Sequence, residues 1–529
     1  MTDLFNRDTQ LQMMHDATVT WDVLVIGGGA TGLGIAMDAV CRGYKTILLE
    51  RFDFAKGTSG RTTKLIHGGV RYLAQGDIRM VREASIERGL LCRNAPHLVR
   101  DQQFIIPVYN YSDLIKYTTG LKVYDWISGR MSLGSSHLLS KKRTLEALPG
   151  IRSKGLLGGV LYHDAQFDDA RLAINLAQSI VIKGGCALNY VRVISLLKNE
   201  AGKLCGVVAK DEETGQSYEI EAKAVINATG VFVDEVLRMD LPNAEKTVCV
   251  SQGVHLVFDK NLFPSVNAMM IPQTSDGRVL FALPWYGHVI MGTTDTAVDE
   301  ALPEPKALDE EVEFILDNAG AYLTAPISRK DVQSVFAGLR PLAAPGTGRK
   351  KTKEISRHHR ILVSSSGLFT MLGGKWTTYR KMGEDMVGSV EKNLKWNHRK
   401  SVTGDMPLHG YKAHVELDDP FHFYGSDAAF IRESLHQGEW LSESLHIHEM
   451  QLHWAVKNEM CRSVEDFLSR RTRALLLDAK ESIRICPAAA RIMSMLLQRD
   501  KTWMQDQTSQ FSNLAQNYLL KESIVSFVH

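Results

Sequence analysis

The strongest constraint on the fold is a glycine-rich turn placed between a buried strand and a helix. Residues 22–26, DVLVI, are rich in leucine and valine, which is typical of a strand buried on both faces. The turn Gly27-x-Gly29-x-x-Gly32 follows, then an apolar helix that ends near Gly43, then a second buried strand at residues 46–50. This order predicts a βαβ unit of about thirty residues, the opening of a doubly wound α/β domain.

The spacing of these glycines suits a dinucleotide cofactor. Gly27 permits the tight turn, Gly29 lets the backbone approach a pyrophosphate, and Gly32 lets helix and strand pack closely, while the helix N-terminus offers N–H groups to phosphate. Glu50 stands 21 residues after Gly29, where an acid binds ribose hydroxyls. The residues predicted to contact the cofactor here are Gly27, Gly28, Gly29, Ala30, Thr31, Gly32 and Glu50.

A second small-residue turn favours FAD over NAD. Asn227-Ala228-Thr229-Gly230 follows a predicted strand at residues 222–226, and such a turn commonly returns to the same pyrophosphate in flavoproteins. The sequence has no second GxGxxG fingerprint for a separate nicotinamide, and no paired redox cysteines of the thiol-disulfide flavoenzymes. We therefore expect FAD as the cofactor.

Composition excludes several other classes of protein. The chain has 62 Lys and Arg against 60 Asp and Glu, a formal charge of +2, which argues against a protein that coats nucleic acid. Its seven cysteines show no CxxC or Cys/His zinc spacing, so we expect no metal site, no disulfide framework and a reducing compartment. The N-terminus does not read as a signal peptide, and residues 23–37, interrupted by glycines, are too short for a membrane span.

The pattern along the chain predicts an α/β (α+β) protein with three parts. Parallel-strand character recurs at residues 222–226 and 361–364, whereas the short apolar runs at 254–258, 279–283 and 288–291 indicate an antiparallel sheet that carries a substrate chamber. One amphipathic helix is expected at 309–323 and several helices at 427–522. The expected parts are an N-terminal extension (1–20), an FAD- and substrate-binding unit (21–400, with FAD parts at about 21–110, 150–250 and 335–400 and substrate parts at about 111–149 and 251–334) and an all-α C-terminal domain (401–529).

Four further motifs are more specific. They are KLIHGGVRYL at 64–73, NATG at 227–230, GLRPL at 338–342 and GGKWTTYR at 373–380. In this order they resemble the FAD-dependent sn-glycerol-3-phosphate dehydrogenases, which have the glycine-oxidase and D-amino-acid-oxidase type of Rossmann-like fold. The resemblance runs from about residue 22 to 380 and resumes at 464–478, VEDFLSRRTRALLLD, which is similar to the family's helical C-terminal domain.

The resemblance implies oxidation of sn-glycerol 3-phosphate to dihydroxyacetone phosphate by hydride transfer to FAD. Removing the hydroxyl proton suits a neutral histidine, whose pKa lies near the working pH. His67 is the first candidate for this base, and His255 resembles a family position that lines the chamber; both remain open.

The substrate phosphate calls for guanidinium groups, which grip phosphate oxygens in pairs. The predicted catalytic residues are His67, His255, Arg340 and Lys375, and the predicted substrate-binding residues are Arg71, Tyr72, Arg340, Arg357 and Lys375. Lys375 is also expected beside the flavin, where a cation stabilises the negative charge that arrives with the hydride. Further predicted cofactor contacts are Thr58, Ser59, Thr63, Lys64, Val191, Ala228, Thr229, Gly230, Gly373, Gly374, Lys375 and Thr377.

The electron acceptor is expected to be a membrane quinone. About 85 residues separate His255 from Arg340, which leaves no obvious room for the long insertion of the related oxidases. Residues 113–143 hold six Lys or Arg against two Asp, with Tyr117, Tyr124 and Trp126 interleaved, which favours peripheral contact with a lipid surface at the inner face of the cytoplasmic membrane. An oxidase that uses oxygen, a flavin-binding sensor without turnover, an ordinary exposed helix-loop at 113–143 and a homodimer are left open.

Two groups of residues have simpler interpretations. His446, His448 and His453 are expected on a surface helix rather than at a metal, and Arg470 and Arg471 are expected to tether the domains.

Overall fold

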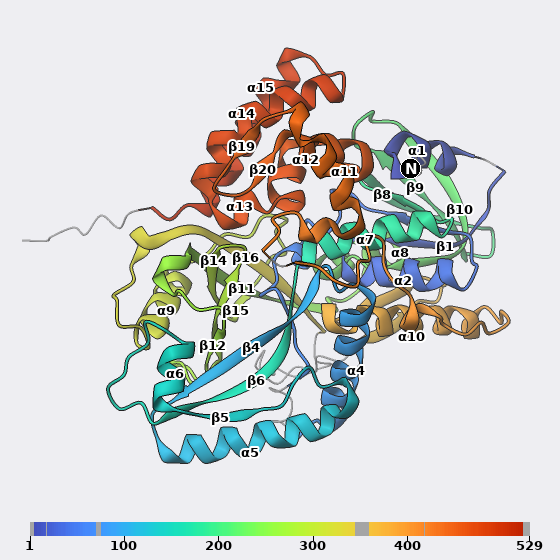
Figure 1. Ribbon diagram of the computed structural model, residues 1–529. Helices are drawn as coiled ribbons and strands as arrows, with labels where there is room; N and C mark the ends of the chain where they lie inside the picture. The colour runs from blue at the N-terminus through green and yellow to red at the C-terminus, as the bar shows by residue number, and fades with distance from the viewer. Residues whose placement is uncertain (1–4, 17, 70–75, 344–358, 417, 522–529) are drawn as a thin grey trace, which may run out of the picture.

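The computed structural model describes residues 5–16, 18–69, 76–343, 359–416 and 418–521. Figure 1 shows two large sheets lying side by side, with the helical C-terminal domain above them. The architecture confirms the expected mixed α/β fold with a helical C-terminal part.

The predicted βαβ unit is confirmed at the centre of the first sheet. Strand β1 (Trp21–Ile26) leads through α2 (Ala30–Cys41) to β2 (Thr46–Leu49), and β1 pairs in parallel with both β2 and β10 (Ser217–Asn227). The strand order is β17-β18-β10-β1-β2-β7. The remaining strands are β7 (Cys186–Leu188), β8 (Val191–Lys198), β9 (Leu204–Asp211), β17 (Arg360–Val363) and β18 (Phe369–Leu372).

One strand assignment was wrong in direction. Residues 361–364 were expected to form a parallel strand, but β17 runs antiparallel to β18, and it is β18 that pairs in parallel with β10. The cause is a tight hairpin, in which the Ser364 amide donates to the Leu368 carbonyl at 3.0 Å and Gly367 adopts φ +99°. The chain therefore reverses before it joins the parallel set.

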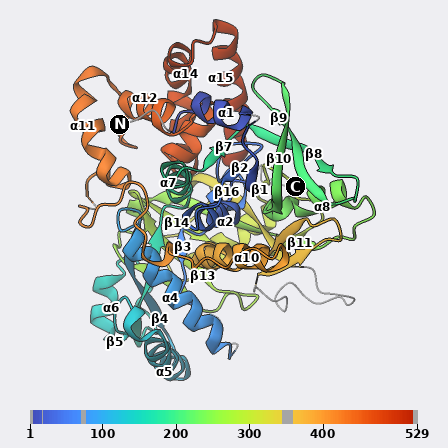
Figure 2. The ribbon, with the colours of Figure 1, turned by 90° about the vertical axis from the view of Figure 1, so that its right-hand side faces the viewer.

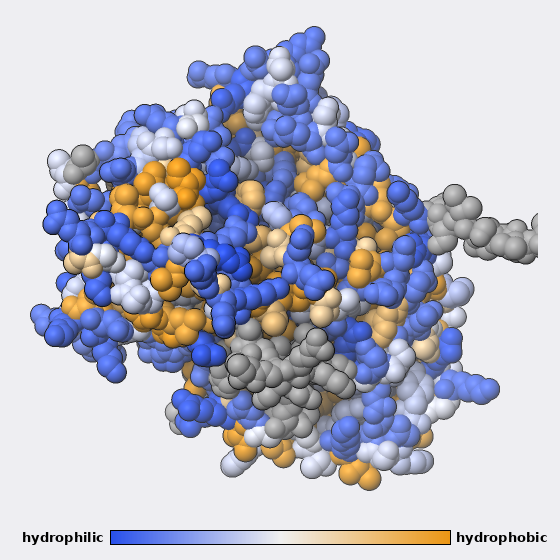
Figure 3. Space-filling model, turned by 180° about the vertical axis from the view of Figure 1, so that it is seen from behind, coloured by the Kyte–Doolittle hydropathy of each residue, from blue (hydrophilic) through white to orange (hydrophobic). Residues whose placement is uncertain are grey.

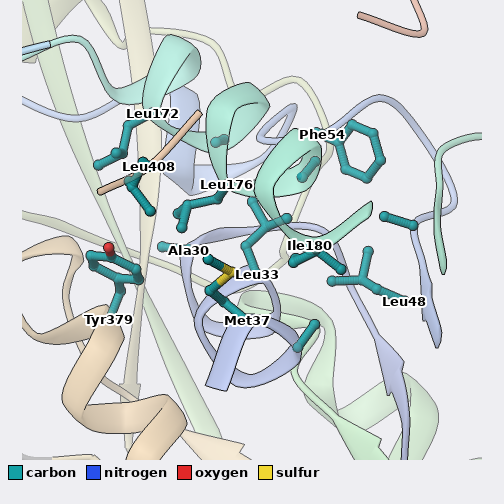
Figure 4. Close-up of a cluster of buried hydrophobic side chains, with 14 of the residues drawn as sticks. Ala30, Leu33, Met37, Leu48, Phe54, Leu172, Leu176, Ile180, Tyr379 and Leu408 are labelled. Atoms are coloured by element: carbon teal, nitrogen blue, oxygen red, sulfur yellow. The ribbon is translucent and has the colours of Figure 1, made fainter. Parts of the chain in front are cut away.

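Helices pack closely on one face of this sheet through small residues, and β8 and β9 cover much of the other face. Figure 4 shows Leu33 and Met37 of α2 facing Leu176 and Ile180 on α7 (Asp169–Ile182), within one buried apolar cluster. On its other side α2 meets α10 (Tyr379–Asn393), where an added Cβ at Gly34 would lie 2.4 Å from the Tyr379 carbonyl oxygen. Two further helices are α1 (Arg7–His15) and α8 (Val233–Asp240).

The second sheet has ten strands, which are mostly antiparallel, as expected. Its order is β15-β11-β14-β13-β12-β4-β6-β3, with β16 beside β11 and β5 beside β6. The strands are β3 (Leu65–Ile66), β4 (Val99–Val108), β5 (His137–Ser140), β6 (Gly158–Phe167), β11 (Val248–Asp259), β12 (Ala268–Ile271), β13 (Leu280–Trp285), β14 (His288–Gly292), β15 (Thr296–Val298) and β16 (Val332–Ala343). Its helices are α4 (Ile78–Asn94), α5 (Tyr111–Ser128), α6 (Lys141–Ala147) and α9 (Asp309–Gly320), the last of which confirms the predicted amphipathic helix.

The C-terminal part is helical, as predicted, with one added hairpin. The helices are α11 (Ala428–Ser434), α12 (Glu449–Asn458), the π-helical turn Asp466–Arg471, α13 (Ala474–Leu477), α14 (Ala479–Leu496) and α15 (Lys501–Ala515), and the hairpin strands are β19 (Trp440–Ser442) and β20 (Ile447–His448). Turned by 90°, the molecule shows α14 and α15 at the end opposite α5 (Figure 2).

The histidines at 446, 448 and 453 do not share a surface helix. His448 is buried and caps α12, accepting the Met450 amide at Nδ1 over 3.1 Å, because it stands at the junction of β20 and α12. His446 precedes β20, and only His453 lies within α12. In the described part of the chain no group of three or more metal-ligating side chains comes together.

Candidate active site

A cavity of about 760 Å³ lies where the two sheets meet, within the range of small-molecule and cofactor sites. Residues from both sheets line it, so it has a nucleotide end beside α2 and a substrate end beside β11 and β16. The predicted site residues that line it are Gly27, Gly29, Ala30, Thr31, Glu50, Thr58, Ser59, Thr63, His67, Val191, Ala228, Thr229, Gly230, His255, Arg340, Gly373, Gly374, Lys375 and Thr377.

At the nucleotide end the two small-residue turns pack against each other. Gly27 adopts φ +111°, and a Cβ there would lie 2.8 Å from the Ala228 carbonyl oxygen. A Cβ at Gly32 would lie only 1.8 Å from the Gly27 carbonyl oxygen, so no other residue fits at the start of α2 without moving the turn. Because the two turns pack so closely, the N-terminus of α2 faces the cavity.

Glu50 supplies the acid of this end. Its Oε2 accepts the Gly28 amide at 2.6 Å and its Oε1 accepts the Phe52 amide at 2.8 Å. Burial raises the pKa of the Glu50 carboxyl above its ordinary value, while the two amides act in the opposite direction. The carboxylate is therefore held in place at the cavity wall before any ligand binds.

These residues fit FAD. The cavity offers an acid for ribose hydroxyls and the first amides of α2 for phosphate; the Ala30 amide now donates to Ser59 Oγ at 2.9 Å. Small residues on both sides leave space for a pyrophosphate, since Gly29 and the turn at 228–230 face the same cavity. The nucleotide end could hold the adenosine and pyrophosphate of this cofactor.

At the substrate end His67 pairs with a buried carboxylate. His67 Nδ1 lies 3.4 Å from Asp164 Oδ2, and the side chain of His67 is 42% exposed whereas that of Asp164 is 1% exposed. The other oxygen of Asp164 accepts the Gly68 amide at 2.9 Å and Arg88 Nη1 at 2.8 Å. Although burial acts to raise the pKa of Asp164, Arg88 and His67 lower it below the ordinary value, so the carboxylate stays ionised.

His255 is buried in a different environment. Its Nε2 lies 2.9 Å from Thr63 Oγ1, its ring stacks on Phe336 with centroids 4.8 Å apart, and its Nδ1 has no hydrogen-bond partner among the residues that the structure describes. Burial, together with the positive charges of Arg340 and Lys64, lowers the pKa of His255 well below its ordinary value. The ring is therefore neutral at neutral pH.

Arg340 reaches the cavity from the predicted GLRPL segment on β16. Nη2 donates to Thr293 Oγ1 at 2.9 Å, Nη1 donates to the Gln252 carbonyl at 3.3 Å, and Asp295 Oδ1 lies 3.5 Å from Nη1. A Cβ at Gly253 would lie 2.2 Å from Nη2, so the glycine leaves room for the guanidinium. Arg340 is thus oriented by its neighbours, as a binding group for an anion needs to be.

The GGKWTTYR segment closes the cavity on the other side. Lys375 lines it, and Lys375 Nζ lies 3.6 Å from Met80 Sδ. The Trp376 indole N–H donates to the Ser59 carbonyl at 2.8 Å, which joins this segment to the turn at 58–60. Gly374 adopts φ +100°, a conformation that favours glycine.

Some predicted residues lie elsewhere. Lys64 is fully buried outside the cavity lining, and its Nζ bonds Asp169 Oδ1 at 2.7 Å and the Gly60 carbonyl at 2.8 Å. Gly28 and Gly32 also lie behind the lining, where Gly28 holds Glu50 and Gly32 packs on Gly27. Arg71, Tyr72 and Arg357 fall outside the described residues.

Sequence reasoning missed the residues that orient the predicted ones. Asp164 behind His67, and Thr293 and Asp295 beside Arg340, belong to no motif named above. The stretch GTTD at 292–295, polar residues directly after a buried strand, was the available signal for two of them. Asp164 had no local signal, because only the pairing of β3 with β6 brings it to His67.

Comparison with known families agrees with this geometry. The model of the FAD-dependent oxidoreductase family (DAO) matches residues 22–380, and the model of the C-terminal domain of alpha-glycerophosphate oxidase matches residues 379–504. The first match covers the two sheets and the cavity, and the second covers most of the helical part.

Curated relatives and a solved structure agree as well. "Probable glycerol-3-phosphate dehydrogenase, mitochondrial" of Dictyostelium discoideum is 35% identical over 96% of this chain and 85% of its own length. "Glycerol-3-phosphate dehydrogenase, mitochondrial" of Homo sapiens is 38% identical over 95% of this chain and 74% of its own length. The structure of the glycerol-3-phosphate dehydrogenase from Bacillus halodurans complexed with FAD is 32% identical, with a TM-score of 0.79 and 98% of each chain covered. On these grounds the chain belongs to the FAD-dependent glycerol-3-phosphate dehydrogenase family.

Proposed function

We propose that this protein oxidises sn-glycerol 3-phosphate to dihydroxyacetone phosphate, with FAD as the hydride acceptor, and passes the electrons to a membrane quinone. The observation that carries the proposal is that His67, His255 and Arg340 line one end of a cavity whose other end is a dinucleotide cradle. A proton acceptor and an anion-binding group therefore face the same space as the predicted cofactor.

Oxidation of the C2 hydroxyl releases one proton from oxygen and one hydride from carbon, leaving a ketone. When bound, FAD supplies the acceptor for the hydride. We assign the proton to His67 rather than His255, because His67 is exposed to the cavity whereas His255 is buried and stays neutral. Asp164 fixes the orientation of the His67 ring and favours the proton on Nδ1, which leaves Nε2 as the acceptor.

Arg340 binds the substrate phosphate in this proposal. Its two Nη groups are already oriented by Thr293 and Gln252, so little side-chain entropy is lost when an anion binds. Arg71 and Arg357, which lie outside the described residues, are proposed as further cations for the phosphate, and Tyr72 as a further contact. Lys375 would lie near the flavin and oppose the negative charge that arrives with the hydride.

The surface of α5 supports a peripheral membrane contact. Tyr111, Ile115 and Trp126 are 73%, 68% and 81% exposed, which is unusual for large apolar side chains on one helix. Figure 1 places α5 along the lower edge of the molecule, and Figure 3 shows hydrophobic residues among hydrophilic ones at that edge. Together with the basic side chains of this region, they match an interfacial segment. Among the described residues no helix is both long and apolar enough to cross a membrane.

We propose attachment at the inner face of the cytoplasmic membrane, and the charges at the start of α6 test it. Reversing Lys141, Lys142 and Arg143 to glutamate should move the protein from the membrane pellet to the supernatant, since each cation near anionic lipid contributes about 1 kcal/mol. The matched control reverses Lys203, Lys210 and Lys223, which lie on or beside the sheet that contains β9 and β10. An unchanged pellet fraction in the α6 variant would contradict the membrane contact.

The reaction itself is tested by anaerobic addition of sn-glycerol 3-phosphate to the flavin-loaded protein. The proposal predicts bleaching of the flavin absorbance, followed by recovery on addition of a quinone analogue and much slower recovery with oxygen. Faster recovery with oxygen than with the quinone analogue would make the protein an oxidase. A flavin that does not bleach would contradict the activity and leave a binding protein.

A further inference from the structure

The loop of residues 51–57 forms a wall of the nucleotide end. It joins Glu50 to the 3-10 turn Thr58–Gly60 and lines the cavity through Arg51, Phe52, Ala55, Lys56 and Gly57. The Phe52 amide donates to Glu50 Oε1 at 2.8 Å, and the Ala55 amide donates to the Gly28 carbonyl at 3.1 Å. The position of this loop therefore sets the direction of the Glu50 carboxylate.

The centre of the loop is held by the helical C-terminal domain. Asp53 is fully buried, and its Oδ2 accepts Arg470 Nε at 2.6 Å and Arg471 Nη1 at 2.7 Å. Its Oδ1 accepts Arg471 Nη2 at 3.0 Å and Asn189 Nδ2 at 3.1 Å. The two arginines stand 417 and 418 positions after Asp53, so the predicted interdomain tether is confirmed and its acceptor is the cofactor loop.

Both arginines end the π-helical turn Asp466–Arg471, a rare geometry that is frequent at functional sites. Arg470 also donates to Asp466 Oδ1 at 2.7 Å and to Glu465 Oε1 at 2.8 Å, so its guanidinium is fixed from its own side. Glu465 in turn accepts Lys56 Nζ at 2.7 Å, which gives the loop a second attachment. The loop is thus clamped at its centre and near its end.

Charge and packing keep this clamp closed. Burial alone would raise the pKa of Asp53, but Arg471 and Arg470 outweigh burial and hold the pKa far below its usual range. Burial also acts to raise the pKa of Glu465, but Arg470 and Lys56 lower it to about 2. Phe54, next to Asp53, is fully buried and lies with Ile180 in the core shown in Figure 4.

Other ion pairs join the helical domain to the sheets without touching the cavity. Arg462 pairs with Glu213 at 2.7 Å, and Arg171 pairs with Glu459 at 2.7 Å. Neither Glu213 nor Arg171 lines the cavity. These ion pairs therefore also hold the helical domain against the rest of the chain, whereas the ion pairs of Asp53 hold the wall of the cofactor site.

We propose that the helical C-terminal domain completes the FAD site, with Arg470 and Arg471 acting as positioning residues that hold the 51–57 loop through Asp53 and so slow the release of FAD. The proposal rests on FAD binding and is independent of the substrate and the electron acceptor. Failure of the flavin to bleach with sn-glycerol 3-phosphate would leave it untouched.

The test measures the rate at which the flavin-loaded, full-length protein releases FAD after dilution, followed by the fluorescence of free flavin. Asp53→Asn should accelerate release on the order of ten- to hundredfold, because the loop and Glu50 lose their fixed position. Glu465→Gln removes the charge that fixes Arg470 and Lys56, so it weakens the same attachment of the loop without changing Asp53 itself, and it should accelerate release by about three- to tenfold. The milder variant keeps the test decisive if Asp53→Asn does not fold.

The control is Arg462→Gln, which breaks an ion pair of the same length across the same two parts of the chain. It should lower the thermal unfolding midpoint while changing FAD release by less than about twofold. Unchanged FAD release in Asp53→Asn or, should that variant not fold, in Glu465→Gln would overturn the proposal. The proposal would also be overturned if Arg462→Gln accelerated FAD release as much as Asp53→Asn or, should that variant not fold, Glu465→Gln. Weaker contact between the helical domain and the rest of the chain would then explain the effect.

Discussion

The two ends of the cavity are built in different ways. The nucleotide end consists mainly of backbone amides and small residues from two short turns, at 27–32 and 228–230, with one acid, Glu50. The substrate end consists of side chains that meet only in the folded chain: Asp164 stands 97 positions from His67, and Thr63 stands 192 positions from His255. The first end depends on where the backbone runs, and the second depends on which side chains converge.

This difference predicts different failures. At the nucleotide end, a substitution that adds volume displaces the backbone and removes the cofactor with it. At the substrate end, a substitution that removes one functional group leaves the cavity and its cofactor intact and affects the reaction alone. Substitutions at each end, with a control for each, test that separation.

The largest effect is expected at Gly32. The Cβ of Gly32→Val would lie 1.8 Å from the Gly27 carbonyl oxygen, so the turn has to move. We expect loss of bound FAD and destabilisation of about 3–5 kcal/mol, measured by flavin content after purification and by thermal unfolding. The control Gly388→Ala, on α10, places its new Cβ more than 4 Å from every described atom apart from its chain neighbours and the adjacent helix backbone, and should retain FAD. Normal FAD content in Gly32→Val would break the contrast between the two ends.

The next largest effect is expected at Arg340. Arg340→Gln should lower kcat/KM for sn-glycerol 3-phosphate on the order of a thousandfold, because a charged contact to phosphate is lost while Asp295 remains nearby. Flavin content should not change. Arg329→Gln, a surface arginine paired with Asp309 and Glu313, serves as the control and should keep kcat/KM within about twofold. A fall in flavin content in Arg340→Gln would show that the ends are not separable.

The two histidines sharpen the comparison within the substrate end. His67→Asn should slow flavin reduction by on the order of a hundredfold, the usual range for a general base, in a stopped-flow anaerobic experiment. His255→Asn should slow it by about tenfold or less, through loss of the contact with Thr63. The reverse order of effects would move the base from His67 to His255.

The sequence could predict the glycine turn and the acid of the nucleotide end, because these parts are local. The packing of the turn at 228–230 on Gly27 and the contacts of the 51–57 loop with the helical domain join residues far apart in the chain. The turn, the helix start and the acid at position 50 lie within 24 residues, and backbone conformation follows from glycine spacing. The substrate end was accessible only through the resemblance, which supplied His67 and Arg340 but not Asp164, Thr293 or Asp295. The direction of β17 was missed for a related reason, since an apolar run of four residues does not tell a parallel strand from an antiparallel one.

An effect as modest as that of His255→Asn is expected at Glu50, whose carboxylate supplies the acid of the nucleotide end. Burial raises the pKa of Glu50, and only its ionised form accepts hydrogen bonds from both ribose hydroxyls. The affinity for FAD should therefore be highest above that raised pKa and fall by about tenfold as pH decreases through it. Glu50→Gln should weaken FAD binding by about tenfold at a pH above the raised pKa and remove this acid dependence, measured by flavin fluorescence as the pH is lowered through that pKa.

The result at Glu50 also separates charge from position. His67→Asn is the control, because it alters a titratable group in the same cavity without touching the ribose end, so its FAD affinity should follow the same pH curve as the unmodified protein. If Glu50→Gln kept the acid dependence, another group would have to carry it, and the nucleotide end would depend on its backbone alone. If Glu50→Gln lost the acid dependence but bound FAD normally, FAD binding would depend on the shape of the side chain at position 50, which the amides of Gly28 and Phe52 hold in place, and not on its charge.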